Sequence, residues 1–232
     1  REAVQAHGRP WTGVCPTQNA IINTFADKTN DSRYDGTFAT AYYGNWTKNP
    51  SDASKKAYNA NNLEVPTGGV IFSFLDSDPG TIQYTSGAGN SNIGAGSIPG
   101  RADWVMAPAS ISRVIFPGLW KIGPYRTDNG NTLGEMNVTS TRPFVIAKFS
   151  ELYLVAAEAA VKGATTQAGK TAKDLINVLR ARAGKWRWQN NGNIAKVQDN
   201  SAAMVAATPL TITIDYVLDE RSRELFGEGQ RW

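Results

Sequence analysis

The chain has 232 residues, of which 41% are hydrophobic and 19% are charged, so its composition is that of a folded globular protein and excludes a disordered chain. Its net charge of +4 is scattered without a long basic run, so we expect no nucleic-acid partner. No segment approaches the roughly 18 consecutive apolar residues that a membrane-spanning helix needs.

The N-terminal stretch carries neither a start methionine nor a signal sequence. It opens on Arg1, with no apolar segment after a charged one, so we expect the sequence to be a mature or excised part of a longer protein. Cys15 is the single cysteine, which excludes an intrachain disulfide. No apolar run precedes Cys15, so we do not interpret "TGVC" as a lipid attachment site.

Residues 1–140 are predicted to be rich in loops, with few short strands. The stretch "PTQNAIINTF" (16–25) has the pattern of one helix, and "GGVIFSFLD" (68–76) that of a strand. Between them and the helical part of the chain, "TSGAGNSNIGAGSIPG" (85–100) predicts a flexible loop because glycine, serine and asparagine dominate it.

Aromatic residues in this region form the candidate ligand site. Tyr42, Tyr43 and Trp46 lie close together in the polar stretch "TAYYGNWTKNPSD", and Tyr58 and Trp104 also have polar neighbours. Burial in a core is the ordinary role of an aromatic side chain. Rings in a polar, glycine-rich loop are harder to bury, and exposed rings can stack on sugars. We therefore take these five residues as candidate ligand-binding residues, with burial as the alternative.

Residues 141–232 predict a helical region. A helix is predicted over 145–162, and Gly163 ends it. Its apolar face, at helical spacing, is formed by residues 145, 149, 152, 153, 156, 157 and 160. A second helix is predicted over 171–183, with Thr171 as its N-cap and Asp174 at the third helical position. Two amphipathic helices joined by a short loop form an antiparallel hairpin.

A third helix is predicted over 213–228. On a helical projection, Arg221 falls within the apolar arc, while Glu220 lies further round, toward water. An arginine in an apolar stripe is costly unless it is paired. Glu224 and Glu228 stand three and seven positions further along, so we predict a structural ion cluster of Arg221, Glu224 and Glu228.

Catalysis is disfavoured by the same pattern. Each carboxylate of the closing stretch "DERSRELFGEGQRW" (219–232) has an arginine within four residues, which keeps it ionised and makes it a poor general acid. His7 is the single histidine. A catalytic triad or a zinc site that needs several histidines is therefore disfavoured. We expect no catalytic residue, no metal and no cofactor, with a glycoside hydrolase as the enzymatic alternative.

Several motifs resemble those of the SusD/RagB family of outer-membrane, nutrient-binding lipoproteins. The stronger matches, in the family's order and spacing, are "RPFVIAKFSELYLVAAEA" (142–159), "INVLRARAG" (176–184) and "VLDERSRELFGEGQRW" (217–232). Weaker similarities lie in "PTQNAIINTF" (16–25), "DSRYDGTF" (31–38) and "GLWKIGPY" (118–125). One departure is Ala147-Lys148, where the family usually has an arginine before the helix.

The resemblance implies a fold that is mainly α, with tetratricopeptide-like helix pairs, an irregular loop-rich region and few short strands. In that picture, residues 1–140 are the loop-rich middle region and 141–232 the tetratricopeptide-like region, with both ends of the family's chain missing. The family's motifs are scaffold, and its sugar sites use variable loops, so no ligand-binding residue is transferred by motif.

The resemblance also implies a function. It is non-enzymatic binding of a glycan, as oligosaccharide or polysaccharide, at the bacterial cell surface, and delivery to a SusC-like TonB-dependent transporter. The location would be the outer membrane, reached only through a lipid anchor that is absent from this chain. The alternative is a protein–protein interaction scaffold without a sugar site of its own.

Overall fold

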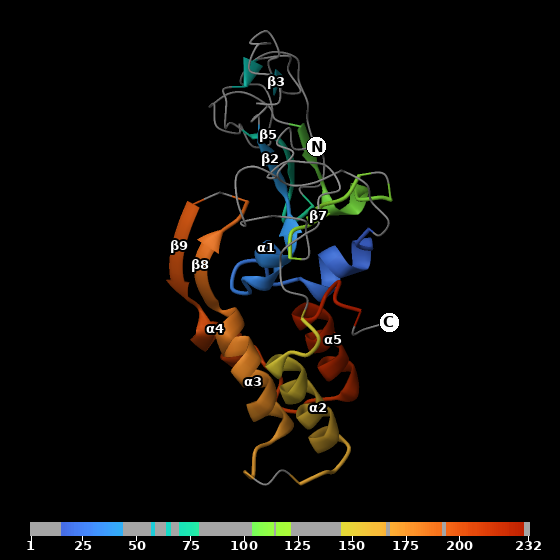
Figure 1. Ribbon diagram of the computed structural model, residues 1–232, viewed down its shortest axis with the longest axis vertical. Coiled ribbons are helices and arrows are strands. Elements are labelled where there is room, and N and C mark those ends of the chain that lie inside the picture. The colour runs from blue at the N-terminus through green and yellow to red at the C-terminus, as the bar shows by residue number, and fades with distance from the viewer. Residues whose placement is uncertain are drawn as a thin grey trace. The chain divides into compact units, whose positions relative to one another are not determined.

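The computed structural model describes residues 15–43, 57–58, 64–65, 70–78, 104–113, 115–121, 145–165, 168–191 and 194–229 (Figure 1). The chain forms two compact units, the first made of Arg1–Gln18, Ala39–Gly118 and Gly123–Pro143 and the second of Asn19–Phe38, Leu119–Ile122 and Phe144–Trp232. The second unit therefore takes in residues 19–38, which lie in the part of the sequence that we assigned to the loop-rich region.

The first unit is built on a three-stranded sheet. Its strands are β2 (Ala41–Tyr43), β5 (Val70–Phe74) and β6 (Trp104–Met106), in the order β2-β5-β6, with β2 antiparallel and β6 parallel to the central strand. β5 confirms the strand predicted over 68–76. Phe74 and Val105 are buried, so the apolar side chains of the central and parallel strands supply the core of this unit.

Shorter elements accompany this sheet. The strands β3 (Ala57–Tyr58) and β4 (Glu64–Val65) form an antiparallel pair, and a 3-10 turn, η3, spans Pro108–Ser110. The two-residue strands β1 (Phe38–Ala39) and β7 (Gly118–Leu119) form a sheet of their own.

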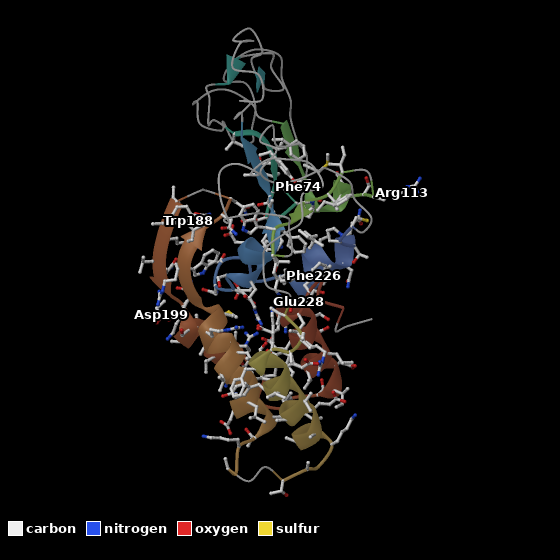
Figure 2. All side chains as sticks on the ribbon, viewed as in Figure 1. Phe74, Arg113, Trp188, Asp199, Phe226 and Glu228 are labelled. Atoms are coloured by element: carbon white, nitrogen blue, oxygen red, sulfur yellow. The ribbon has the colours of Figure 1, made fainter. Side chains whose placement is uncertain are left out.

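The second unit begins with an aromatic cluster. The helix predicted over 16–25 forms as the short π-helix η2 (Ala20–Thr24), and α1 (Arg33–Thr37) follows it. Phe25 packs against Tyr34, Phe38 and Phe226, with ring centroids 5.4–6.0 Å away. Phe226 lies just beyond the last helix of the chain (Figure 2), so these rings join the N-terminal and C-terminal parts of the unit.

The helices α2 (Phe149–Val161) and α3 (Ala172–Ala183) pack together as a pair (Figure 1). At the N-terminus of α3, the Thr171 hydroxyl accepts a hydrogen bond from the Asp174 N–H, and the Asp174 carboxylate accepts one from the Thr171 N–H. This capping box satisfies two backbone donors of the first turn. It confirms the start of the helix that the sequence predicts.

The buried face of α2 differs from the predicted one. Leu154 and Ala157 are fully buried, whereas Phe149 and Leu152, which the helical spacing assigned to the core, are 72% and 60% exposed. The helix also begins at residue 149 instead of 145. Its sequence, FSELYLVAAEAAV, is apolar on almost every side, so periodicity alone does not select a face. The packing of α3 and α5 against α2 decides which residues are covered.

A β-hairpin follows α3, although the sequence analysis assigned this region to helices. Its strands are β8 (Lys185–Gln189) and β9 (Ile194–Asp199), which pair antiparallel. Gly184 precedes β8, and a Cβ at this position would lie 2.7 Å from the backbone of Asn200. The close approach of two backbone segments therefore requires glycine there.

The chain ends with α4 (Ser201–Ala206) and α5 (Ile214–Glu224). The Thr213 hydroxyl caps α5 by accepting a hydrogen bond from the Tyr216 N–H. α5 ends at Glu224, four residues before the predicted end, and turns follow it. Among the described residues, no helix has the length and hydropathy to cross a membrane.

Candidate functional site

The sheet of the first unit places two of the predicted ligand residues, Tyr42 and Trp104, on either side of one residue of its central strand. Phe72 of β5 pairs with Tyr42 on one side and with Trp104 on the other. The Tyr42 ring lies 5.9 Å from the Phe72 ring, and its hydroxyl oxygen accepts a hydrogen bond from the Gly118 N–H at 3.2 Å. These contacts give Tyr42 a structural role at both ends of its side chain.

The other predicted ligand residues are less fully defined. Tyr43 lies in β2, Tyr58 in β3 and Trp104 in β6, and for these three residues the structure describes the backbone alone. Trp46 falls outside the described residues. Ligand contact at Tyr43, Tyr58, Trp104 and Trp46 therefore stays a prediction. Phe72, which lies between two of the predicted positions, was missed because its place depends on strand pairing.

A buried ion network occupies the centre of the second unit, and Glu220 of α5 lies at its middle. Arg33 of α1 donates a hydrogen bond to Glu220 at 2.8 Å, Arg223 donates at 2.8 Å, and Arg180 of α3 at 3.4 Å. The Glu220 side chain is 0% exposed. The prediction that Glu220 faces water is therefore wrong, because η2 and α1 cover the side of α5 that the helical projection left open.

The charges around Glu220 determine its ionisation. Burial opposes the charged form and is the largest influence, but the guanidinium groups of Arg33, Arg223 and Arg180 together outweigh it and lower the pKa of Glu220 to about 2. The pKa of Arg33 is raised, because its acidic neighbours Glu220, Asp31 and Glu224 outweigh the effect of burial. Both groups therefore remain ionised near neutral pH.

Arg33 extends this network to the rest of the second unit. It makes a bidentate contact with Asp31, at 2.9 and 2.7 Å, and a further contact with Glu224 at 3.2 Å. Glu224 also accepts a hydrogen bond from Arg182 of α3. The motif "DSRYDGTF" (31–38) is thereby tied to the end of α5, far away in the sequence.

The predicted ion cluster of Arg221, Glu224 and Glu228 does not form as one cluster. Arg221 pairs with Glu151 of α2 at 3.5 Å, and its side chain is 11% exposed. The pairing of Arg221 with Glu224 and Glu228 is therefore wrong. Arg221 points to the neighbouring helix α2, whereas Glu224 lies toward Arg33 on another side of α5.

Glu228 belongs to a separate ion pair group beyond the end of α5 (Figure 2). It contacts Lys148 at 2.6 Å and also Lys121. Burial would raise the pKa of Glu228, but its hydrogen bonds to Lys121 and Lys148 outweigh burial and lower it. Burial lowers the pKa of Lys121, and its contact with Glu228 partly offsets that effect.

This arrangement is suited to holding segments together. A general acid needs a carboxyl group that is protonated near neutral pH. Glu220, Glu224 and Glu228 each accept contacts from two or more cationic side chains, and Glu220 is closed to solvent. In the ranges that the structure describes, no group of three or more histidine, cysteine, aspartate or glutamate residues is placed to hold a metal ion.

The hairpin of β8 and β9 adds an aromatic feature, at Trp186 and Trp188, that lies outside the five candidate ligand-binding residues. Trp186 is 2% exposed, its indole N–H donates to the Asn30 carbonyl at 3.3 Å, and the Lys196 ammonium lies 3.4 Å from its ring centre. Trp188, which is labelled in Figure 2, lies two positions further along β8. It is 49% exposed. The alternating stretch "KWRWQ" was the available signal for a strand with two tryptophans.

Comparison with known proteins bears on the second unit above all. Residues 121–232 match the model of the SusD family, and the search of curated proteins found no match. Proteins of this family in general bind glycans for nutrient uptake, lack catalytic activity, work with SusC-like transporters and are surface-exposed outer-membrane lipoproteins. The match includes all three stronger motifs, so the resemblance to the SusD family is confirmed over residues 121–232.

Proposed function

We propose that this protein binds oligosaccharide or polysaccharide at the bacterial cell surface, without cleaving it, and passes it to a TonB-dependent outer-membrane transporter. The observation that carries the proposal is the SusD-family match over residues 121–232. Surface attachment through a lipid anchor and tetratricopeptide-like pairing of α2 and α3 are parts of the same proposal. The α2–α3 pair supports the latter because the two helices follow each other through a short connection and pack together.

The ion network supports a role without catalysis. The carboxylates of the α5 motif hold α1, α3 and the segment around Lys121 in place. A carboxylate with a pKa of about 2 in a closed site is unable to donate a proton to a leaving group at neutral pH. The motif that is most typical of the family is thereby interpreted as scaffold.

For the sugar contact, the proposal keeps the five aromatic positions of the first unit. Tyr42, Tyr43, Trp46, Tyr58 and Trp104 are candidates. Because the Tyr42 side chain is engaged by Phe72 and Gly118, we expect it to position the loop that follows β2. Trp46 is then the residue of that loop from which we expect direct stacking on a sugar ring.

A glycan array on the purified protein tests the function, and calorimetry on Trp46→Ala tests the site. We expect Trp46→Ala to weaken binding by about 1–2 kcal/mol while leaving the melting temperature nearly unchanged. A large fall in melting temperature would show that Trp46 belongs to a core. An array on which the wild-type protein retains no glycan would contradict the proposed function itself.

A protein-interaction scaffold is the second candidate, and the exposed apolar side of α2 favours it. Phe149, Leu152 and Val155 are 72%, 60% and 50% exposed. Such residues on one helix are typical of a surface that another protein covers. In that case Leu152→Asp would weaken association with the transporter, and the glycan array would give no signal. Glycan binding that Leu152→Asp leaves intact would favour the first candidate.

A further inference from the structure

Two tryptophans of β8 have opposite surroundings. Trp186 is enclosed, hydrogen-bonded and covered by a lysine. Trp188 has 49% of its surface exposed, and within the described part of the chain no hydrogen bond or ring contact engages its indole. Nothing in the core of the unit explains why so large an apolar side chain is held at the surface.

Strand pairing explains why the Trp188 ring is left open. Trp188 lies opposite Ala195 of β9, so its direct neighbour across the ladder is a methyl group, which is too small to cover an indole. The next pair, Gln189 and Ile194, faces the other side of the ribbon. The register also shifts between Trp186 and Trp188, which separates the covered ring from the open one.

The strand that carries Trp188 is firmly held. Directly after β8, the buried carboxylate of Asp35 accepts hydrogen bonds from the N–H groups of Asn190 at 2.7 Å and Asn191 at 3.3 Å. The Asn190 side chain donates to the Asp35 carbonyl oxygen at 3.1 Å. With Trp186 anchored before it, the backbone that carries Trp188 is fixed in position, so a ligand does not have to order the strand on binding.

The neighbouring side chains distinguish between possible ligands. Ala195 directly faces Trp188, and the adjacent residue Arg187 is exposed and charged. Gln198 lies opposite Trp186. The hairpin also carries two exposed apolar residues, Ile194 on the other side of the ribbon and Val197 further along β9. A protein partner would be favoured by a broad apolar patch around the ring. One open ring on a strand with exposed polar residues suits a sugar, which has an apolar C–H face and hydroxyl groups around its rim.

We propose that Trp188 is a stacking platform for a pyranose ring of a bound oligosaccharide. The C–H face of the sugar lies on the indole, and hydroxyl groups at its rim can bond to polar side chains of the hairpin. This inference rests on the proposed glycan-binding function, but it places a contact in the SusD-family part of the chain, apart from the candidate residues of the first unit.

The test is calorimetric titration of the full chain with linear gluco-, xylo-, manno- and galacto-hexasaccharides. Wild type is compared with Trp188→Ala, with Trp188→Phe, and with Val197→Ala as a control, since Val197 is an exposed residue of the same hairpin. We expect Trp188→Ala to weaken binding about tenfold, Trp188→Phe to weaken it less, and Val197→Ala to have no effect. Because the ring is half exposed, the melting temperature should stay close to that of wild type.

Tryptophan emission gives a second readout, since a sugar stacked on Trp188 changes the emission of the wild-type protein, and we expect the change to be smaller in Trp188→Ala. If Trp188→Ala and Trp188→Phe bind the hexasaccharide as wild type does, the inference is overturned while the proposed function stands. If Trp188→Ala binds glycan normally but no longer associates with the transporter, the surface is a protein contact and the inference is also overturned. If wild type binds none of the hexasaccharides or arrayed glycans, the proposed function is contradicted, and the inference is overturned with it.

Discussion

Replacing Glu220 by glutamine removes one buried negative charge and changes little in shape. Glu220 is the common partner of Arg33, Arg223 and Arg180, at 2.8, 2.8 and 3.4 Å, and its side chain is 0% exposed. In Glu220→Gln, these guanidinium groups lose the charge that balances them in a closed site. They retain other acceptors, because Arg33 still bonds to Asp31.

The expected loss of stability in Glu220→Gln follows from the pKa of Glu220. It is about 2 in the folded protein, against an ordinary value of 4.5. At about 1.4 kcal/mol for each pH unit, this difference amounts to about 3 kcal/mol of folding free energy at neutral pH. Breaking a buried ion pair by removing one partner typically costs about 3–5 kcal/mol, which agrees. We therefore expect Glu220→Gln to lower the free energy of unfolding by about 3 kcal/mol.

The sign of the pH dependence follows from the same pKa. A carboxyl group whose pKa is lowered by folding stabilises the folded state fully above its unfolded pKa. It loses this contribution as pH falls toward its folded pKa. For Glu220 the loss runs from about pH 4.5 down to about pH 2. The stability of wild type should therefore fall over this range by about 3 kcal/mol more than that of Glu220→Gln.

Urea unfolding of wild type, Glu220→Gln and Asp219→Asn at neutral and acid pH measures both effects. Asp219 is an exposed carboxylate next to Glu220 on the same helix, so its substitution is a matched control with an expected cost below about 0.5 kcal/mol. If Glu220→Gln costs no more than Asp219→Asn, the interpretation of the network as the scaffold of this unit is refuted.

Three further substitutions test local features by thermal or urea unfolding. Thr171→Ala removes the N-cap of α3 and should cost about 1 kcal/mol, so an unchanged melting temperature would contradict the capping box. Gly184→Ala should cost several kcal/mol, roughly as overpacking does, because the added Cβ would meet backbone at 2.7 Å. Gly36→Ala is the control: a Cβ there would have no atom within 4 Å, so the substitution should be neutral or slightly stabilising. Equal effects of the two substitutions would be evidence against the close approach at Gly184. Arg221→Ala should cost about 1 kcal/mol, since its pair with Glu151 is partly exposed, and a cost as large as that of Glu220→Gln would show that Arg221 has stronger partners.

Local signals allowed the start of α3 to be predicted, and long-range contacts explain where the prediction of α5 failed. The capping box of Thr171 and Asp174 is contained within four residues, so the sequence shows it directly. Glu220 is paired with Arg33, which is 187 positions away, and no periodic pattern along α5 indicates that partner. The helical projection consequently placed a fully buried carboxylate toward water.

For the candidate sites too, local sequence identifies single residues, whereas their neighbours depend on contacts between distant segments. A polar, aromatic-rich stretch identifies Tyr42 and Trp46 as candidates, but only strand pairing reveals that Phe72 lies between Tyr42 and Trp104. The hairpin with Trp188 had a local signal in the alternation of "KWRWQ". The helical assignment of the surrounding region concealed it, because two strong helices directly precede that stretch.

The central claim is that this protein binds a glycan and leaves it intact, and both halves of the claim can be measured in one sample. The protein is incubated with a polysaccharide that it retains on the array, and the bound fraction and the newly formed reducing ends are followed together. The account predicts saturable binding with no increase in reducing ends above the protein-free control. Release of oligosaccharides that Glu224→Gln or Glu228→Gln abolishes, with the melting temperature unchanged, would contradict it.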